Sequence, residues 1–147
     1  ESVADHIFSM AIMGMIFSDL ENYNTEKILK IILLHDLAES ITGDMTPEQI
    51  SKEEKRVLEN KAMEKILNYL PPSLQKQYSV LWEEYQLNNS KEAKIVHQID
   101  RLEMALQAKI YSNEGYPKEK LDSFFNSASN EIVDPKLLEL FRKMLEK

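Results

Sequence analysis

The sequence of 147 residues has no cysteine, three glycines and five prolines. The lack of cysteine excludes a disulfide scaffold, a cysteine-ligated zinc finger and a thiol enzyme. Apolar runs last only a few residues, far short of the roughly 18–20 that a membrane-spanning helix needs, so we expect no membrane partner. The first residues are acidic and lack the basic start and apolar core of a secretory signal. These absences lead us to expect a cytoplasmic protein.

Positive charge is also scarce, because 18 Lys and Arg residues stand against 25 Asp and Glu residues, for a net charge of −7. Proteins that bind nucleic-acid polymers neutralise phosphates with Lys and Arg. The sequence therefore predicts no polymer partner. A small anionic ligand stays open, since one bound metal ion supplies the positive charge that the chain lacks.

The residues that are present favour helices. Leu is far more abundant than Val, and glycine is scarce; Leu, Lys, Glu, Met and Gln favour helices, whereas β-branched residues favour strands. We expect an all-α fold: a single compact bundle of six or seven helices in one domain over residues 1–147. The apolar spacing and the turn residues predict helices over 3–20, 25–42, 51–70, 72–85, 91–111, 118–128 and 135–146, with Thr25 as an N-cap. The chain opens with Glu1 rather than Met, so we also expect a natural N-terminal segment ahead of it.

Four residues stand where helices should present their buried sides: His6, His35, Asp36 and Asp100. Each has an ordinary explanation by itself, as a core histidine bonded to a carbonyl or as an exposed or cap-bonded carboxylate. Burying all of them without partners would be costly. Together, two imidazoles and two carboxylates can hold one divalent cation such as Mn²⁺, Co²⁺, Fe²⁺ or Mg²⁺. Four ligands on an octahedral ion leave two positions, for a water and for a phosphate oxygen.

The surroundings of these residues resemble a known family. The segments SVADH, HDLAESITGDMTP and HQIDRLEMALQA are similar to those of the HD-domain phosphohydrolase superfamily, and within it to the 5′-deoxynucleotidases. The resemblance implies a metal-dependent phosphomonoesterase that acts on deoxyribonucleoside 5′-monophosphates. It implies that His6, His35, Asp36 and Asp100 are the metal ligands. It also implies that Glu39 acts on the attacking water or on the leaving oxygen, and that Asp44 contacts the sugar and helps to exclude a 2′-hydroxyl. In this hypothesis Asp36 or Glu39 orients or deprotonates the water.

Several alternatives remain open from the residues alone. Glu39 can be a partner of the metal ligands and Asp44 a turn residue. Thr46 and Arg101 lie close enough to the motifs to bind substrate, although Arg101 can instead pair with a nearby Glu. His97 is expected to face solvent. The chain can also hydrolyse another phosphate ester or a phosphodiester, or bind a metal and sense nucleotides with little turnover. By resemblance alone, we expect a homodimer.

Overall fold

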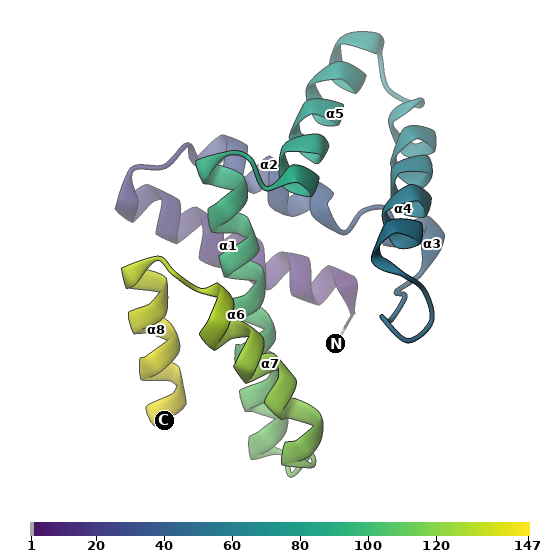
Figure 1. The fold of residues 1–147 in the computed structure, drawn as a ribbon. Helices are drawn as coiled ribbons and strands as arrows, with labels where there is room; N and C mark the ends of the chain where they lie inside the picture. The colour runs from purple at the N-terminus through teal and green to yellow at the C-terminus, as the bar shows by residue number, and fades with distance from the viewer. Residues whose placement is uncertain (1) are drawn as a thin grey trace.

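The structure is a computed structural model that describes residues 2–147. Helices are the regular elements of this part of the chain: α1 (Val3–Glu21), α2 (Thr25–His35), α3 (Glu39–Thr42), α4 (Lys52–Leu67), α5 (Pro72–Leu87), α6 (Lys91–Asn113), α7 (Lys118–Glu131) and α8 (Pro135–Glu146) (Figure 1). Helix α3 is a single turn of 4 residues, and the next shortest helix, α2, has 11. The expected all-α bundle of six or seven helices is confirmed, with α3 as an additional turn.

Local signals explain where most helices begin. The Ser2 hydroxyl accepts a hydrogen bond from the backbone N–H of Asp5, and the Asp5 carboxylate accepts one from the backbone N–H of Ser2. Such a capping box satisfies amide groups that have no partner inside the helix. The sequence predicted Thr25 as the N-cap of α2, and this prediction is wrong. Asn24 takes that role, because its Oδ1 accepts the backbone N–H of Lys27 at 3.0 Å.

The predicted helix over residues 25–42 is interrupted after His35. Asp36 leaves the helical conformation at φ −108° and ψ 7°, and the next backbone bonds join residues three apart, including Leu37 N–H to the Leu34 carbonyl at 3.1 Å. Such bonds tighten the chain relative to an α-helix. The predicted range places His35 and Glu39 on one continuous helix, and that prediction is therefore wrong. Glu39 instead begins α3 after a turn.

The packing places α6 through the middle of the molecule, with α7 and α8 on one side and the α4–α5 pair on the other (Figure 1). One apolar cluster joins α1, α2, α6 and α8, and a second joins the end of α2 with α4 and α5. Gly14 lets α1 approach α2 closely, since an added Cβ would lie 2.4 Å from Cδ1 of Ile32. The segment from His35 to Glu39 lies where the two clusters meet.

Helix α1 corrects one expectation about membranes. Its 19 residues reach a mean hydropathy of 1.3, so by length and composition alone it is able to span a bilayer. The length of apolar runs does not reveal this property, because α1 interleaves its apolar residues with Asp5, His6 and Ser9. In the structure, Met10, Gly14 and Phe17 on α1 are buried in the core against α2 and α6.

Candidate active site

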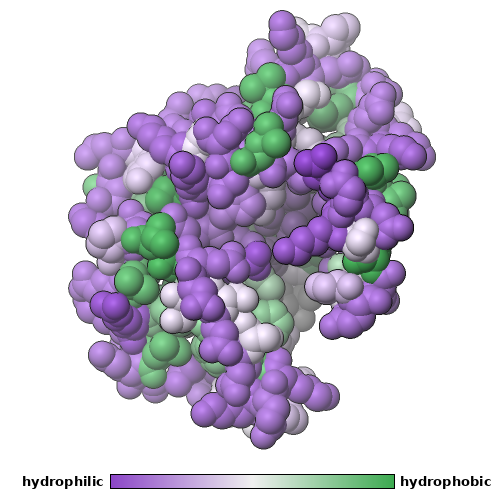
Figure 2. All heavy atoms as spheres, in the orientation of Figure 1, coloured by the Kyte–Doolittle hydropathy of each residue, from purple (hydrophilic) through white to green (hydrophobic). Residues whose placement is uncertain are grey.

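The four predicted metal ligands meet in one cavity of about 400 Å³. It lies between the first turns of α1, the end of α2, the middle of α6 and the first turns of α4. Figure 2 shows the surface hollowed between α6 and α4, with mostly hydrophilic residues on the rim. The lining comprises Ser2, Val3, His6, His35, Asp36, Glu39, Asp44, Lys55, Glu59, Tyr85, Gln86, Asp100, Arg101 and Met104. Residues up to 102 positions apart in the sequence, Ser2 and Met104, are thus brought together.

His6 is held from behind by a carboxylate. Its Nδ1 bonds to Oε2 of Glu103, a buried residue of α6, while its Nε2 lies 3.0 Å from Oδ1 of Asp100. Burial disfavours the charged imidazole, but the hydrogen bonds to Asp100 and Glu103 outweigh that effect and raise the pKa of His6 to about 10. A carboxylate behind a histidine that turns its other nitrogen to the site is the usual support of a metal ligand.

His35 presents a free nitrogen to the same cavity. Its Nδ1 donates to the carbonyl of Ile32 at 2.6 Å, which leaves the lone pair on Nε2. This Nε2 is buried and has no hydrogen-bond partner among the described residues. A buried polar atom without a partner is rare because it costs free energy. A metal ion bound at this nitrogen would satisfy it.

The two carboxylates complete the donor set. Oδ2 of Asp36 lies 3.2 Å from Nε2 of His35 and 3.8 Å from Nε2 of His6. One ligand atom from each of these three residues lies within 4.8 Å of the others, and Asp100 approaches from the side of His6. Two nitrogens and two carboxylate oxygens suit Mn²⁺, Co²⁺, Fe²⁺ or Mg²⁺. The residues therefore fit the expected metal ion.

Glu39 reaches the cavity despite the break after α2. Burial raises the pKa of Glu39 to about 7, and the carboxylates of Asp36 and Asp44 add to the rise. Lys55 on α4 opposes it, with its Nζ 3.8 Å from Oε1 of Glu39 and 3.6 Å from Oε1 of Glu59. A carboxylate that titrates near neutral pH can take a proton from water and release it again.

The three predicted substrate contacts are placed differently. Asp44 and Arg101 line the cavity. Nε of Arg101 donates to Glu131 at 2.9 Å, which is the pairing with a Glu that the sequence left open. Thr46 lies on the exposed loop before α4, outside the lining residues of the described chain, and its backbone N–H donates to Gln49. Its contact with substrate stays a prediction.

Three residues of the site were not predicted from the sequence: Glu103, Tyr85 and Lys55. Glu103 follows Asp100 by three positions on an apolar helix, and that spacing was the available signal. Tyr85 on α5 places its ring against His35, and its other face stacks on His97. The expectation that His97 faces solvent is wrong, because its ring is half-buried against Tyr85 and its Nε2 donates to the Tyr85 carbonyl at 2.8 Å.

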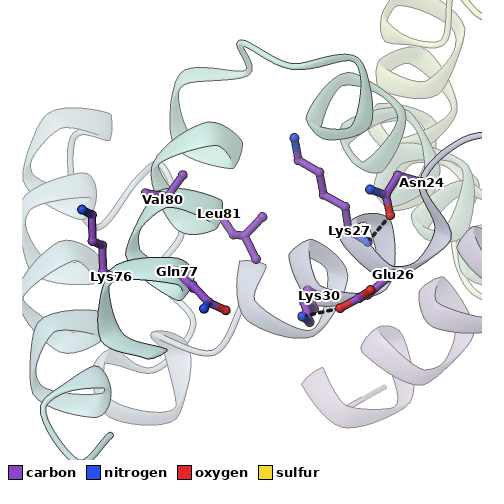
Figure 3. A pocket seen from close by; sticks show the side chains of 8 residues that line it. All are labelled: Asn24, Glu26, Lys27, Lys30, Lys76, Gln77, Val80 and Leu81. Carbon is purple, nitrogen blue, oxygen red and sulfur yellow. Dashed lines mark hydrogen bonds and ion pairs between the residues drawn. The ribbon is translucent and has the colours of Figure 1, made fainter. Parts of the chain in front are cut away.

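A second cavity, of about 460 Å³, lies away from this cluster between α2 and α5 (Figure 3). It is lined by Lys27, Lys30 and Lys76 with apolar Val80 and Leu81. Two of the lysines already have carboxylate partners: Lys30 pairs with Glu26 at 2.6 Å and Lys27 with Glu84 at 2.8 Å. We therefore place the chemistry in the smaller cavity, where the histidines and carboxylates converge.

Known proteins resemble the chain over nearly its whole length. The 5′-deoxynucleotidase HDDC2 of Homo sapiens is 39% identical over 145 residues, which cover 98% of this chain and 71% of that protein. The 5′-deoxynucleotidase hdd1 of Schizosaccharomyces pombe is 42% identical over 129 residues, covering 84% of this chain and 65% of that protein.

Solved structures share the fold. The PH0347 protein of Pyrococcus horikoshii matches with a TM-score of 0.77 and 30% identity, covering 98% of this chain and 82% of that one. A predicted metal-dependent phosphohydrolase of Magnetospirillum magnetotacticum shows the same fold, with a TM-score of 0.74 and 24% identity over 99% of this chain and 78% of its own. The HD domain family matches residues 1–140. The chain, with His35 and Asp36 side by side at the centre of its cavity, therefore belongs to the HD-domain family.

Proposed function

We propose that this protein is a metal-dependent phosphomonoesterase that hydrolyses deoxyribonucleoside 5′-monophosphates. The observation that carries the proposal is the buried Nε2 of His35, which has no hydrogen-bond partner among the described residues, lies 3.2 Å from Oδ2 of Asp36, and shares an open cavity with His6 and Asp100. Relatives that cover nearly the whole chain are named 5′-deoxynucleotidases, which supports this substrate class.

His6, His35, Asp36 and Asp100 would hold the ion. A divalent ion bound there would acidify a water and polarise a phosphate oxygen. The carboxylates of Asp36, Glu39, Asp44, Glu59 and Asp100 outnumber the cations of Lys55 and Arg101 in the cavity. A phosphate dianion is therefore repelled by the protein alone, which explains why the activity should need the metal.

The protein side chains would divide the remaining work. Glu39 takes a proton from the attacking water while the water oxygen bonds to phosphorus. The bond between phosphorus and the 5′ oxygen breaks, and the Glu39 carboxyl passes its proton to the leaving 5′ oxygen to give the deoxynucleoside and regenerate the carboxylate. Arg101 contributes charge-assisted hydrogen bonds to the phosphate. Asp44, at the outer part of the cavity, accepts hydrogen bonds from the sugar and crowds a 2′-hydroxyl.

A substrate panel tests the proposal. Phosphate release is measured from deoxyribonucleoside and ribonucleoside 5′-monophosphates and from a phosphodiester, each with added Mn²⁺, Co²⁺ or Mg²⁺. We expect release from the deoxyribonucleotides. Faster cleavage of the phosphodiester would favour a different HD-family hydrolase, and tight nucleotide binding without release would favour a sensing module.

We also propose that the protein is a homodimer that pairs through α1. The outer face of α1 exposes Phe8 (68%), Ile12 (41%), Ile16 (52%) and Leu20 (72%), at steps of four residues along one side of the helix. The same helix contains no Lys or Arg. Because peripheral membrane helices carry such cations to meet anionic lipids, a second copy of the chain suits this face better than a lipid surface.

A further inference from the structure

We propose that the hydroxyl of Tyr85 donates a hydrogen bond to a phosphate oxygen of the bound substrate. The inference deepens the proposed function and rests on it for the identity of the substrate. It makes Tyr85 a substrate-binding residue of the cavity, contributed by α5 rather than by the helices that carry the metal ligands.

The position of the ring supports this contact. Tyr85 lines the same cavity as the four ligands, and its ring lies edge-on to His35, with 5.3 Å between the ring centroids and an angle of 67°. The same wall carries Asp36, Glu59, Asp100 and Arg101, so the Tyr85 side chain lies among the charged groups of the cavity. A phosphate oxygen near the metal ligands would lie within its reach.

The ring is also held rigidly. Its second face stacks on His97, with centroids 4.1 Å apart and an angle of 4° between the planes. Nε2 of His97 donates to the carbonyl of Tyr85 at 2.8 Å, which ties the α5 backbone to α6. A donor that needs no reorganisation binds its acceptor with less loss of conformational entropy. Tyr85 is therefore preorganised for a ligand.

Its hydroxyl has no partner in the described chain, whereas other donors of the cavity are already engaged in part. No hydrogen bond to the Tyr85 hydroxyl occurs among residues 2–147. Lys55 lies near Glu39 and Glu59, and the Ser2 hydroxyl donates to Asp5. Arg101 donates its Nε–H to Glu131, which leaves its Nη2 for the phosphate. Gln86 is a further lining donor, but no ring contact holds it. The Tyr85 hydroxyl is also neutral, so it does not form an ion pair with the carboxylates of the cavity and stays free to bind phosphate.

The test is the variant Tyr85→Phe, which removes the hydroxyl and leaves both ring contacts in place. Binding of inorganic phosphate and of a deoxynucleoside is measured by calorimetry on the Mn²⁺-loaded protein, and metal content by elemental analysis. We expect unchanged metal content and deoxynucleoside binding, with phosphate binding weakened roughly 10- to 100-fold, as for a lost hydrogen bond to a charged group. The ratio kcat/KM for a deoxynucleotide should fall by a similar factor.

The matched control is Tyr78→Phe on the same helix, which packs against the second apolar cluster outside the cavity and should leave phosphate binding unchanged. Phosphate binding by Tyr85→Phe at the wild-type level would overturn the proposal. So would weakened deoxynucleoside binding with normal phosphate binding, because the hydroxyl would then serve the sugar or base. If the wild-type protein hydrolyses no deoxynucleotide but its phosphate binding depends on Tyr85, the proposed function fails and this inference stands.

Discussion

His35 and Asp36 are each expected to be needed for metal binding. Removing either one takes a ligand from a set of four, so His35→Ala and Asp36→Ala should each lose bound metal and turnover. The fold should survive in part, because the apolar clusters do not include the metal ligands. Elemental analysis after gel filtration measures the loss. His97→Ala, which removes a histidine outside the ligand set, is the control, and wild-type metal content in either ligand variant would refute the assignment.

Glu39 gives a prediction that depends on pH. The pKa of its carboxyl in the metal-free protein, about 7, lies above its ordinary value of 4.5. The folded state therefore binds this proton more tightly than the unfolded state, and the resulting stability is present below pH 4.5 and is lost as the pH rises through 7. Glu39→Gln should lose stability less steeply over that window. Thermal unfolding with a chelator, from pH 5 to pH 8, measures the difference.

The same variant, Glu39→Gln, tests whether Glu39 acts as a general acid or base. Glu39→Gln should retain metal while turnover falls by about 10²–10⁴-fold, the usual contribution of a general acid or base. Glu53→Gln, an exposed carboxylate on α4 with a side chain 74% accessible, should change neither measurement. Unchanged turnover in Glu39→Gln would make this residue a support of its neighbours. If the stability of Glu39→Gln depends on pH as that of the wild type does, burial does not raise the pKa of Glu39.

At the scale of single residues, the sequence predicted which four candidate ligands converge in the cavity better than it predicted the residues that support them. His6, His35, Asp36 and Asp100 stood out because charged residues on apolar helix faces need partners. Tyr85 and Lys55 did not, because a tyrosine or a lysine on an amphipathic helix has an ordinary explanation. Their roles depend on how α4 and α5 pack against the end of α2, and no local pattern encodes that packing.

At the scale of the elements, capping residues and prolines predicted most helix boundaries. Ser51 and Glu54 form a capping box at α4, and Pro72 and Pro135 lie in the first turns of α5 and α8. The break at Asp36 was missed, since the apolar spacing continues through Leu37 and Ala38. The turn is stabilised by tertiary contacts of Ala38 and Leu37 with the second apolar cluster rather than by a local breaker.

Close approach of α1 and α2 is expected to control the metal site. Gly14 lies against Ile28 and Ile32, so Gly14→Val must push the two helices apart or strain their side chains. Overpacking of this kind typically costs about 1–3 kcal/mol of unfolding free energy. Because α1 carries His6 and α2 carries His35, metal affinity should fall together with stability.

Denaturant unfolding and metal titration of Gly14→Val measure the two effects. Met15→Val is the control, since it places the same β-branched residue on the exposed side of α1. A stable Gly14→Val protein with normal metal affinity would show that the helix pair adjusts without moving the ligands.

For the whole molecule, the exposed apolar face of α1 predicts self-association. Contiguous apolar surface on a monomer is uncommon and usually marks an interface. A two-fold pair of α1 helices would bury Ile12 and Ile16 of both copies near its axis, while His6 and the cavity stay on the inner side of each α1. Ile16→Lys puts a charge into that interface and should convert a dimer into a monomer.

Light scattering coupled to gel filtration measures the mass of each species, and metal content shows whether the site is intact. Val133→Lys is the control, because Val133 is 73% exposed in the segment between α7 and α8 and is not part of the apolar face of α1, so its substitution should leave the dimer unchanged. Binding to vesicles of neutral and anionic lipid tests the alternative that the apolar face of α1 contacts a membrane. A monomeric wild-type protein that binds vesicles through Ile16 would mean that α1 meets lipid, and a dimer that persists in Ile16→Lys would place the interface on another face.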